Sequence, residues 1–485
     1  ETPDDGIVMT RHQVTLEGRT MAYTARAGKI PIRHNETGEI RAYIFFVSYS
    51  LEPEQDKEPR PLTFLWNGGP GSNSSLVHLL GFGPKRAQTS GPATDNPGTW
   101  LDFTDLVFID PVGTGYSRPV KTEYGRDFYQ TRGDAESVAE FIRVYRNRFE
   151  RWDAPLFIGG ESFGVRRAAG VAEVLERRHI PVDGVILISL DLPLGNLSPE
   201  LRAALMVPTF TAAAFFHMKL APELQADMAA ALRSAEQWAE KEYAPALAKR
   251  DSLNEPQRRS VVSQLARFTG LNPRLVDPKT LSVDMSRFTQ LLLKDENLVV
   301  GRYDSRLTGP LDPNEKIYDP TKDPSLKNII DDVSVVRYFQ RELKYESDLL
   351  YQGPFGGGYP PPDKPRGDWM SVKWNWTPAE LASFSTEEGQ KEKKAVEGVV
   401  EMPLRNAMTA NPRLRVFMAS GYFDLVCSYA GNAAIAARLE PELRRRVTVR
   451  AYPGGHAIYT DEAAQLVMKR DVMEFFRSSI PGPRP

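Results

Sequence analysis

Apolar and polar residues alternate along the first fifty positions of the chain. The alternation covers residues 14–23 and returns at 40–49, with the polar stretch RHNETGEI between the two. A period of two residues is typical of a strand with one buried face, and a polar connection that contains glycine is typical of a hairpin. The pattern therefore predicts two antiparallel strands near the amino terminus.

Short apolar runs then alternate with stretches of helical periodicity. Within one such stretch, Val138, Phe141, Ile142 and Tyr145 recur at a spacing that places them on one helix face. Strands that alternate with helices in this way predict a mostly parallel sheet with helices on both faces, which is the α/β class. The predicted strands are residues 61–66, 105–110, 155–160 and 184–190, and the predicted helices are 134–152 and 163–178.

The rhythm of strands and helices stops in the middle of the chain and returns near the carboxyl end. The middle part is rich in alanine or irregular, and it contains a stretch rich in glycine and proline at 353–365. We expect an α/β core, residues 1–195 and 377–485, interrupted by a largely helical lid or insertion, residues 196–376. Insertions of this length commonly cover or shape a site. The later core elements are two predicted strands, 414–421 and 447–455, and a closing helix, 461–478.

The charge, the apolar runs and the cysteine count exclude several classes of partner and of structure. The chain has 485 residues and a formal net charge of −2, from 61 Lys and Arg against 63 Asp and Glu. This balance provides no basic excess for a nucleic acid or an anionic membrane. The sequence contains no run of about 18 apolar residues that would predict a membrane span. The single cysteine, Cys427, excludes an internal disulfide.

The stretch GESFG, residues 160–164, lies between a predicted strand and a predicted helix. A strand that turns directly into a helix forces the turn residue, Ser162, into a strained conformation, and side chains two positions away on either side would collide. Glycine is therefore needed at 160 and 164. The serine hydroxyl then projects above the sheet beside a helix amino terminus, which favours a developing negative charge. The context predicts a nucleophile, although five residues with two glycines can also occur by composition alone.

A nucleophilic serine needs a base, and hydrolases with this turn place an acid and then a histidine later in the chain. His456 follows a late predicted strand, in the loop PGGHAIY, where α/β sites are built. His217 lies inside the helical insertion and is more simply a half-buried helix histidine. His179 ends the helix that follows Ser162 and is therefore far from the turn.

The acid should also follow a late strand. Asp424 does so in VFMASGYFD, 32 residues before His456, and the alternative is a solvated loop aspartate. Asp461 is a weaker candidate, because its place suggests a cap of the final helix.

Acyl transfer also needs donors for the oxyanion. The stretch WNGGPGS follows an early predicted strand, and glycine amides there can approach a ligand closely. We expect the Gly69 and Phe163 backbone N–H groups to form the pair. The alternative is a plain tight turn.

The motifs WNGGPGSNSS, DPVGTGYS, GGESFG, GYFDLVC and GGHAIYTDEA occur in an order and spacing that resemble the serine carboxypeptidases, over residues 61–195 and 405–480. The resemblance implies an α/β-hydrolase fold and a triad of Ser162, Asp424 and His456. It also implies that Gly69 and Phe163 hold the oxyanion.

The resemblance further implies residues that bind substrate. Asn67 and Glu161 match residues that bind the carboxylate of the substrate, and Gly68 is grouped with them. Glu161 can donate a hydrogen bond to a carboxylate only when it is protonated, so an acidic pH optimum follows. The alternative for Glu161 is a charged residue without a role. Cys427 matches a cysteine that lines a substrate pocket in some relatives, and a small buried hydrophobe is the alternative.

The sequence departs from the family pattern at the substrate end. Gly81 stands where the family commonly has a second glutamate, and Lys85 and Arg86 are the nearby cations that could replace it. Ala457 follows His456 where relatives often have methionine. Ser72 stands in place of a usual cysteine, which indicates a bacterial-type member without disulfides.

We expect a serine carboxypeptidase that acts on peptides, favours acidic pH and needs no cofactor or metal. An esterase, amidase or acyltransferase that uses the same triad is the first alternative, because Gly81 weakens the case for carboxylate recognition. A non-enzymatic binding protein of hydrolase fold is the second. The resemblance is compatible with a homodimer. The chain starts without methionine, which together with the family habit predicts a secreted or periplasmic protein.

Overall fold

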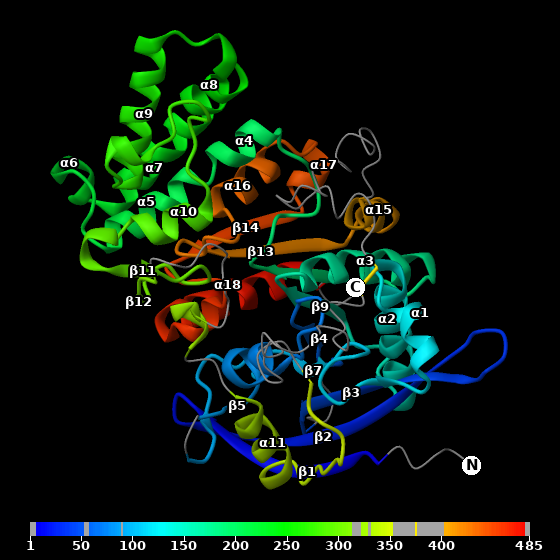
Figure 1. Ribbon diagram of the computed structural model, residues 1–485. Coiled ribbons are helices and arrows are strands. Elements are labelled where there is room, and N and C mark those ends of the chain that lie inside the picture. The colour runs from blue at the N-terminus through cyan, green and yellow to red at the C-terminus, as the bar shows by residue number, and fades with distance from the viewer. Residues whose placement is uncertain are drawn as a thin grey trace. The chain divides into compact units, whose positions relative to one another are not determined.

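The computed structural model describes residues 6–52, 58–88, 91–312, 322–327, 331–352, 374–375 and 402–480 (Figure 1). The chain forms two compact units. The first unit comprises Glu1–Ile188, Ile330–Phe417 and Gln465–Pro485, and the second comprises Ser189–Ile329 and Met418–Ala464.

The first unit is built on a twisted sheet whose strands follow the order β1-β2-β3-β7-β4-β9-β10. Three long strands pair antiparallel at one side, and the four that follow are short, fully buried and mutually parallel. These continuous apolar runs suit a sheet that is covered on both faces. The strands are β1 (Val8–Leu16), β2 (Arg19–Arg33), β3 (Ile40–Leu51), β4 (Leu62–Trp66), β7 (Asp105–Ile109), β9 (Leu156–Glu161) and β10 (Gly184–Ile188).

The predicted strand at 14–23 is wrong, because a hairpin turn interrupts it. Glu17 and Gly18 have positive φ values of 49° and 80°, and Leu16 pairs with Arg19 across the turn. Two left-handed residues between strands make the tight turn that matches strand twist. A two-residue turn also keeps the alternation of apolar and polar residues in phase across both strands. The buried residues Val14 and Met21 are cross-strand partners, so the sequence pattern does not reveal the turn.

Helices cover both faces of this sheet, as predicted. Phe64 of β4 packs edge-on against Tyr145 of α2, and α2 in turn packs against α3. On the opposite face Phe157 of β9 stacks on Phe476 of α18, with ring centroids 3.8 Å apart. The helices and short strands of this unit are α1 (Gly125–Phe128), α2 (Thr131–Arg148), α3 (Gly164–Arg177), α11 (Asp332–Arg341), α15 (Pro403–Ala410), α18 (Glu462–Ser479), the π-helix η1 (Leu76–Phe82), η2 (Thr122–Tyr124), β5 (Lys85–Arg86), β6 (Thr94–Asp95) and β8 (Arg118–Pro119).

The second unit is mainly helical. Its helices are α4 (Pro199–Ala204), α5 (Val207–Phe216), α6 (Pro222–Gln225), α7 (Met228–Trp238), η3 (Ala239–Tyr243), α8 (Ala244–Ala248), η4 (Arg250–Ser252), α9 (Glu255–Thr269), η5 (Pro273–Leu275), α10 (Met285–Leu291), η6 (Lys294–Glu296), η8 (Pro324–Leu326), α16 (Tyr429–Ala437), α17 (Pro441–Arg444) and η9 (Ile458–Thr460). Its strands are the hairpin β11 (Leu298–Val300) and β12 (Thr308–Pro310), and the neighbours β13 (Arg415–Gly421) and β14 (Val447–Tyr452). The boundary between the units falls within β13.

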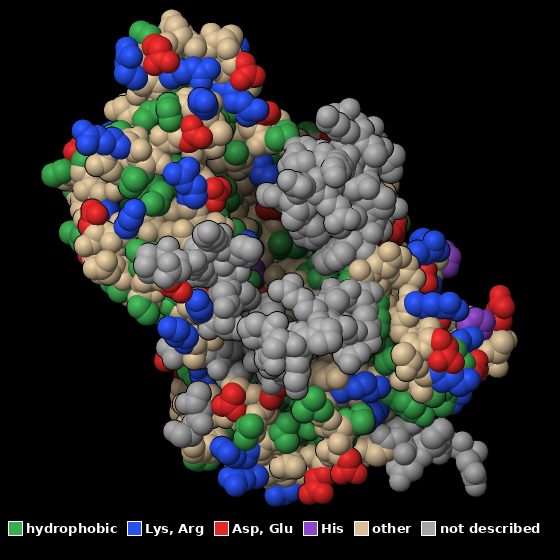
Figure 2. Space-filling model, viewed as in Figure 1, with side chains coloured by type: hydrophobic (Ala, Val, Ile, Leu, Met, Phe, Trp, Pro, Cys, Tyr) green, Lys and Arg blue, Asp and Glu red, His purple; other side chains and the backbone are tan. Residues whose placement is uncertain are grey.

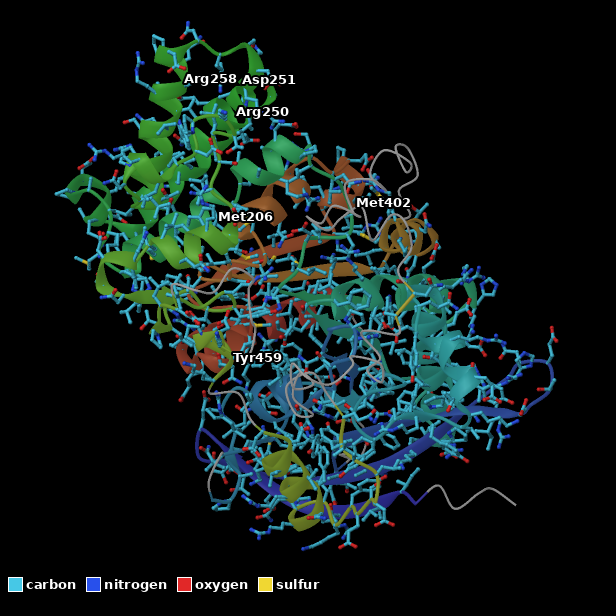
Figure 3. All side chains as sticks on the ribbon, viewed as in Figure 1. Met206, Arg250, Asp251, Arg258, Met402 and Tyr459 are labelled. Atoms are coloured by element: carbon cyan, nitrogen blue, oxygen red, sulfur yellow. The ribbon has the colours of Figure 1, made fainter. Side chains whose placement is uncertain are left out.

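Side-chain hydrogen bonds to backbone carbonyl groups join turns of the second unit. Arg258, labelled with Arg250 and Asp251 in Figure 3, donates to the carbonyl oxygens of Leu253 and Pro278 at 3.1 Å each and to that of Arg250. On the face shown in Figure 2, Lys and Arg side chains are interspersed with Asp and Glu over the helices of this unit. In the part of the chain that the structure describes, no helix is both long enough and apolar enough to cross a bilayer.

The compact units divide the chain differently from the predicted core and insertion. Residues 418–464, which we expected in the core, join the first part of the predicted insertion. Hydrogen bonds explain the grouping, because Leu425 N–H donates to the Arg302 carbonyl at 3.1 Å and the Ser428 hydroxyl donates to that of Leu205. The stretch 353–365 and the predicted end of the insertion at 376 lie outside the described residues, so the extent of the insertion stays a prediction.

Candidate active site

Ser162 occupies the turn between β9 and α3 and has a left-handed backbone, with φ of 56°. Its N–H donates to the Ile188 carbonyl at 2.9 Å, which ties the turn to the neighbouring strand β10. A Cβ at Gly160 would collide with the Gly164 carbonyl, and a Cβ at Gly164 would lie 2.9 Å from Trp66 Cδ1. The turn therefore needs both glycines, as the sequence predicted, and its serine carries the strain that such turns store.

The loop after β4 lies directly against this turn. A Cβ at Gly68 would collide with the Phe163 backbone nitrogen and lie 2.8 Å from that of Gly164, so only glycine allows this approach. The next residue, Gly69, has φ of 104°, a conformation that L side chains rarely adopt. The predicted oxyanion donors Gly69 and Phe163 thus come from two backbone segments in contact. Their joint action on an oxyanion stays a prediction.

Asn67 and Glu161 are hydrogen-bonded to each other. The Asn67 amide nitrogen donates to Glu161 Oε2 at 3.1 Å, and both residues are nearly fully buried. The amide is oriented by its oxygen, which accepts from Val77 N–H of η1 at 3.1 Å. The structure therefore brings together the two residues that the resemblance assigns to carboxylate binding, with an amide N–H group directed at a carboxyl group.

A buried arginine that sequence reasoning missed supports this arrangement. Arg167 of α3 is 1% exposed, pairs with Asp134 of α2 at 2.6 Å, and donates to the Asn67 carbonyl at 2.7 Å. Burial raises the pKa of the Asp134 carboxyl, and the Arg167 charge opposes that rise. Arg167 thus fixes the Asn67 backbone to two helices. The available signal was an arginine five residues after Ser162, on a helix side that is otherwise apolar.

The predicted acid and base form a pair in the second unit. His456 Nδ1 lies 2.7 Å from Asp424 Oδ2, and both side chains are buried. The other carboxylate oxygen, Oδ1, accepts from the N–H groups of Val426 at 2.8 Å and Cys427 at 3.3 Å. The loop therefore holds the carboxylate while Oδ2 faces the imidazole. A histidine that donates from Nδ1 to a carboxylate presents Nε2 as the proton acceptor, which is the tautomer a general base needs.

Ser162 belongs to the first unit and the Asp424–His456 pair to the second, so the predicted proton transfer between Ser162 and His456 stays a prediction.

The weaker candidates for the acid and the base make other contacts. The Asp461 carboxylate accepts from Ala464 N–H at 3.0 Å, as expected of a cap of the final helix. His217 Nε2 lies 2.7 Å from the Ser305 carbonyl, as expected of a structural histidine.

Cys427 is 1% exposed, and its sulfur lies 3.5 Å from the Asn432 amide nitrogen. Burial raises the pKa of the thiol, which keeps it protonated and unreactive. These features favour the alternative of a small buried hydrophobe, and a contact of Cys427 with substrate stays a prediction.

Lys85 and Arg86, the cations expected near Gly81, both contact other side chains, and their replacement of the missing glutamate stays a prediction. Lys85 pairs with Asp95, and Arg86 lies 3.3 Å from the Gln465 side-chain oxygen. The Gly81 carbonyl accepts from Gln465 Nε2 at 2.5 Å. Among the residues with described positions, no cluster of three or more His, Cys, Asp or Glu could hold a metal ion.

Comparison with known proteins bears on the segment that carries Asn67, Glu161 and Ser162. The family model described as serine carboxypeptidase matches residues 26–180. The resemblance to serine carboxypeptidases is confirmed. Pheromone-processing carboxypeptidase kex1 of Schizosaccharomyces pombe is 30% identical over 154 residues, which are 30% of this chain and 28% of that protein. KEX1 of Leptosphaeria maculans is 33% identical over 158 residues, or 32% of this chain and 23% of that protein. The matched part thus spans about a quarter of the length of these carboxypeptidases.

The fold is that of the α/β-hydrolases. The crystal structure of Kex1(Δ)p, a prohormone-processing carboxypeptidase from Saccharomyces cerevisiae, superimposes on 94% of this chain and 91% of that one, with a TM-score of 0.52. The two sequences are 15% identical over this superposition, so the likeness establishes the fold alone.

Proposed function

We propose that the protein is a serine-type carboxypeptidase that releases residues from the carboxyl end of peptides. The observation that carries the proposal is the left-handed Ser162 in a strand–turn–helix that needs glycine at 160 and 164. A strained turn of this kind has its use in exposing a nucleophile. The Asp424–His456 pair supplies the second support, because an oriented imidazole is the base that such a serine requires.

The proposed reaction proceeds through an acyl-enzyme. His456 Nε2 takes the proton from the Ser162 hydroxyl as its oxygen attacks the carbonyl carbon of the substrate, and the Gly69 and Phe163 N–H groups hold the oxyanion. His456 then gives its proton to the leaving amine as the carbon–nitrogen bond breaks. A water molecule, activated by the same imidazole, releases the acyl group. Asp424 holds the tautomer and stabilises the imidazolium.

Selectivity for a free carboxyl terminus is assigned to Asn67 and Glu161. The Asn67 amide can donate to a substrate carboxylate at any pH, whereas Glu161 can donate only in its protonated form. Two ionised carboxyl groups at one site repel each other, so binding of the free acid weakens as pH rises. The proposed activity therefore favours acidic pH.

An esterase, amidase or acyltransferase with the same triad remains the second candidate. Gly81 favours it, because the usual second glutamate is absent and the nearby Lys85 pairs with Asp95. Such an enzyme would turn over small esters or amides without a free carboxylate, and its rate would depend little on Glu161.

A paired assay separates the two candidates. One substrate is an N-blocked dipeptide with a free carboxyl terminus, the other is its carboxyl-terminal amide or ester, and kcat/KM is measured from about pH 4 to about pH 8. A carboxypeptidase prefers the free acid at low pH and loses that preference as pH rises. Preference for the blocked substrate throughout the range would contradict carboxypeptidase selectivity and leave the hydrolase chemistry standing.

Ser162→Ala tests the nucleophile directly. The variant should lose turnover of both substrates and should no longer react with a fluorophosphonate probe. Ser198→Ala, which alters a helix-capping serine in the second unit, is the matched control and should keep both properties. Retained turnover or labelling in Ser162→Ala would overturn the assignment, and the non-enzymatic alternative would gain support if the unmodified protein failed to react.

We also propose that the protein works outside the cytoplasm, as a secreted or periplasmic enzyme. The proposal is supported by the names of the similar proteins, which are pheromone-processing carboxypeptidases, because a pheromone is a product that a cell exports. Fractionation of the producing cells, with detection of this chain in each fraction, tests the proposal, and a purely cytoplasmic protein would contradict it.

A further inference from the structure

The tip of the β11–β12 hairpin, residues 301–307, lies against the loop of the candidate base. His456 N–H donates to the Tyr303 carbonyl at 2.6 Å, and the Tyr303 ring meets the imidazole edge-on, with centroids 5.3 Å apart. A Cβ at Gly455 would lie 2.5 Å from the Tyr303 carbonyl oxygen and 2.6 Å from Asp304 Cβ. The two loops therefore touch at the backbone, and a larger residue at 455 would force them apart.

The same hairpin tip also holds the loop of the candidate acid. Ser305 N–H donates to the Phe423 carbonyl at 2.9 Å, and Leu425 N–H donates to the Arg302 carbonyl at 3.1 Å. These bonds involve the residues immediately before and after Asp424. One short segment thus fixes the backbone on both sides of the acid and at the base itself.

Arg306 connects these contacts through its side chain. The guanidinium forms a two-bond ion pair with Asp304, at 2.9 and 2.7 Å, and donates to Asp461 Oδ2 at 2.8 Å and to the Pro453 carbonyl at 3.0 Å. It also lies over the Phe423 ring, 5.0 Å from the centroid. Arg306 therefore contacts the hairpin tip, the residue before Asp424, and positions on either side of His456.

The hairpin tip is itself held in place, which allows it to act as a support. Gly301 N–H donates to the Leu307 carbonyl at 2.8 Å across the tip. Arg302 N–H donates to Asp323 Oδ2 at 3.0 Å, and Tyr303 N–H donates to the Ser325 hydroxyl at 3.1 Å, both at η8. The tip is thus anchored to the hairpin and to η8, and it meets the loops of Asp424 and His456 through the Arg302 and Tyr303 carbonyl groups and the Ser305 N–H group.

We propose that the hairpin tip is a positioning device for the Asp424–His456 pair, and that Arg306 is its positioning residue. The tip contributes no reacting atom. It sets the distance and angle between a carboxylate and an imidazole that lie on separate loops, and the bidentate, planar guanidinium suits that task better than a lysine would. The proposal rests on the proposed function in one respect, namely that this pair serves as the base of the reaction.

Arg306→Gln tests the device, with Arg306→Lys as the conservative variant and Arg267→Gln as the matched control. Arg267 pairs with Glu223 at 3.4 Å on the exposed surface of the same unit. A small misplacement of catalytic groups can cost about a hundredfold in rate. We expect Arg306→Gln to lower kcat about ten- to hundredfold with KM within about twofold, Arg306→Lys to recover part of that loss, and Arg267→Gln to match the unmodified protein.

The low-field proton resonance of an imidazole N–H bonded to a carboxylate provides a readout that does not need turnover. It is assigned by its loss in Asp424→Asn. We expect the resonance to shift or broaden in Arg306→Gln and to keep its position in Arg267→Gln. The proposal would be overturned if Arg306→Gln lowered only the melting temperature and left both the resonance and the kcat per folded molecule unchanged. Arg306 would then be a stabilising residue and not a positioning residue.

Failure of the proposed function gives a different result. In that case the unmodified protein lacks turnover and fluorophosphonate labelling, while the resonance still reports whether Arg306 positions the pair. If Arg306→Gln does not fold, Asp304→Asn replaces it, because that change removes the charge of the bidentate partner and keeps the side-chain size. A shifted resonance in Asp304→Asn supports the device, and an unchanged one overturns it.

Discussion

The two units hold their parts of the candidate site in different ways. In the first unit, Ser162 is positioned by a two-residue turn inside the five-residue motif 160–164, with parallel strands before and beside it and a helix after it. In the second unit, Asp424 and His456 lie in separate loops, and a hairpin tip far away in the sequence bonds to both. One part depends on local backbone geometry and the other on long-range hydrogen bonds.

This difference teaches which changes each part should tolerate. A residue with a strained backbone lowers the free energy of unfolding by on the order of 1–3 kcal/mol. It keeps that conformation only because the surrounding strands and helix hold it in place. Individual hydrogen bonds contribute about 1 kcal/mol each, so an array of several can lose one member and still form. We therefore expect the Ser162 turn to respond chiefly to added volume, and the loops of Asp424 and His456 to respond also to lost charge and lost hydrogen-bond geometry.

Asp424→Asn should have the largest effect and would test the second unit at its centre. An amide can donate to Nδ1 and so favours the wrong imidazole tautomer, with a loss of about 10⁴-fold in kcat for a triad aspartate. The measurement is kcat for an activated ester together with a circular dichroism spectrum that shows a native fold. A loss below about tenfold would remove Asp424 from the triad.

Gly164→Ala tests the first unit by adding a single methyl group. The new Cβ would lie 2.9 Å from Trp66 Cδ1 and 3.0 Å from the Asn67 carbonyl oxygen, and overpacking of this kind costs about 1–3 kcal/mol. We expect a lower free energy of unfolding and a loss of kcat, because the turn and the Asn67 loop must move apart.

Gly431→Ala in α16 of the second unit is the matched control for Gly164→Ala. Its nearest neighbour would be Ser428 Cβ at 3.4 Å, an ordinary contact, so alanine should stabilise this helix by roughly 0.5–1 kcal/mol. If Gly164→Ala and Gly431→Ala lowered the melting temperature equally, the expected difference between the Ser162 turn and a helix of the second unit would be contradicted.

Glu161→Gln should change the pH profile more than the maximum rate. Glutamine donates a hydrogen bond at every pH, so the repulsion between two carboxylates disappears. We expect kcat/KM for a free-acid dipeptide to persist to higher pH. Where kcat/KM of the unmodified protein falls with rising pH, a shift of that fall by about one pH unit makes kcat/KM of the variant about tenfold higher at the same pH. The amide substrate serves as the control. An unchanged profile would remove Glu161 from carboxylate recognition.

Asp332→Asn should have the smallest effect and concerns stability alone. Burial raises the pKa of Asp110 to about 6 and that of Asp332 to about 7, and the Asp110 charge adds to the rise at Asp332. A carboxyl group with a raised pKa binds its proton more tightly in the folded state. The free energy of unfolding therefore falls as pH rises from about 4 to about 7.

Asparagine cannot ionise, so Asp332→Asn should be more stable than the unmodified protein at pH 8, by about 1–2 kcal/mol after allowance for partial solvent screening. The two proteins should differ little near pH 4. Denaturant unfolding at both pH values measures this, with the exposed Asp348→Asn as the control. A stability difference that is the same at both pH values would contradict the assigned titration.

The sequence predicted the first unit well because its signals are local. The buried strands, the helices α2 and α3, and the glycines around Ser162 follow from apolar periodicity and from the collisions that a tight turn imposes. The hairpin turn at Glu17 and Gly18 was missed because a two-residue turn preserves the alternation on both strands. Arg167 was missed because its partner Asp134 lies on a different helix, and only the packing of α3 on α2 makes the pair.

The sequence by itself determined which residues could carry the chemistry: a serine on a glycine-flanked turn, and an acid and a histidine after late strands. Only the tertiary structure decided how these residues are held. The Asp424–His456 bond, the Asn67–Glu161 contact and the Arg306 ion pair with Asp461 all join positions that are distant along the chain. Local sequence sets backbone conformation through sterics, whereas contacts between distant segments depend on how strands and helices pack, which no short pattern encodes.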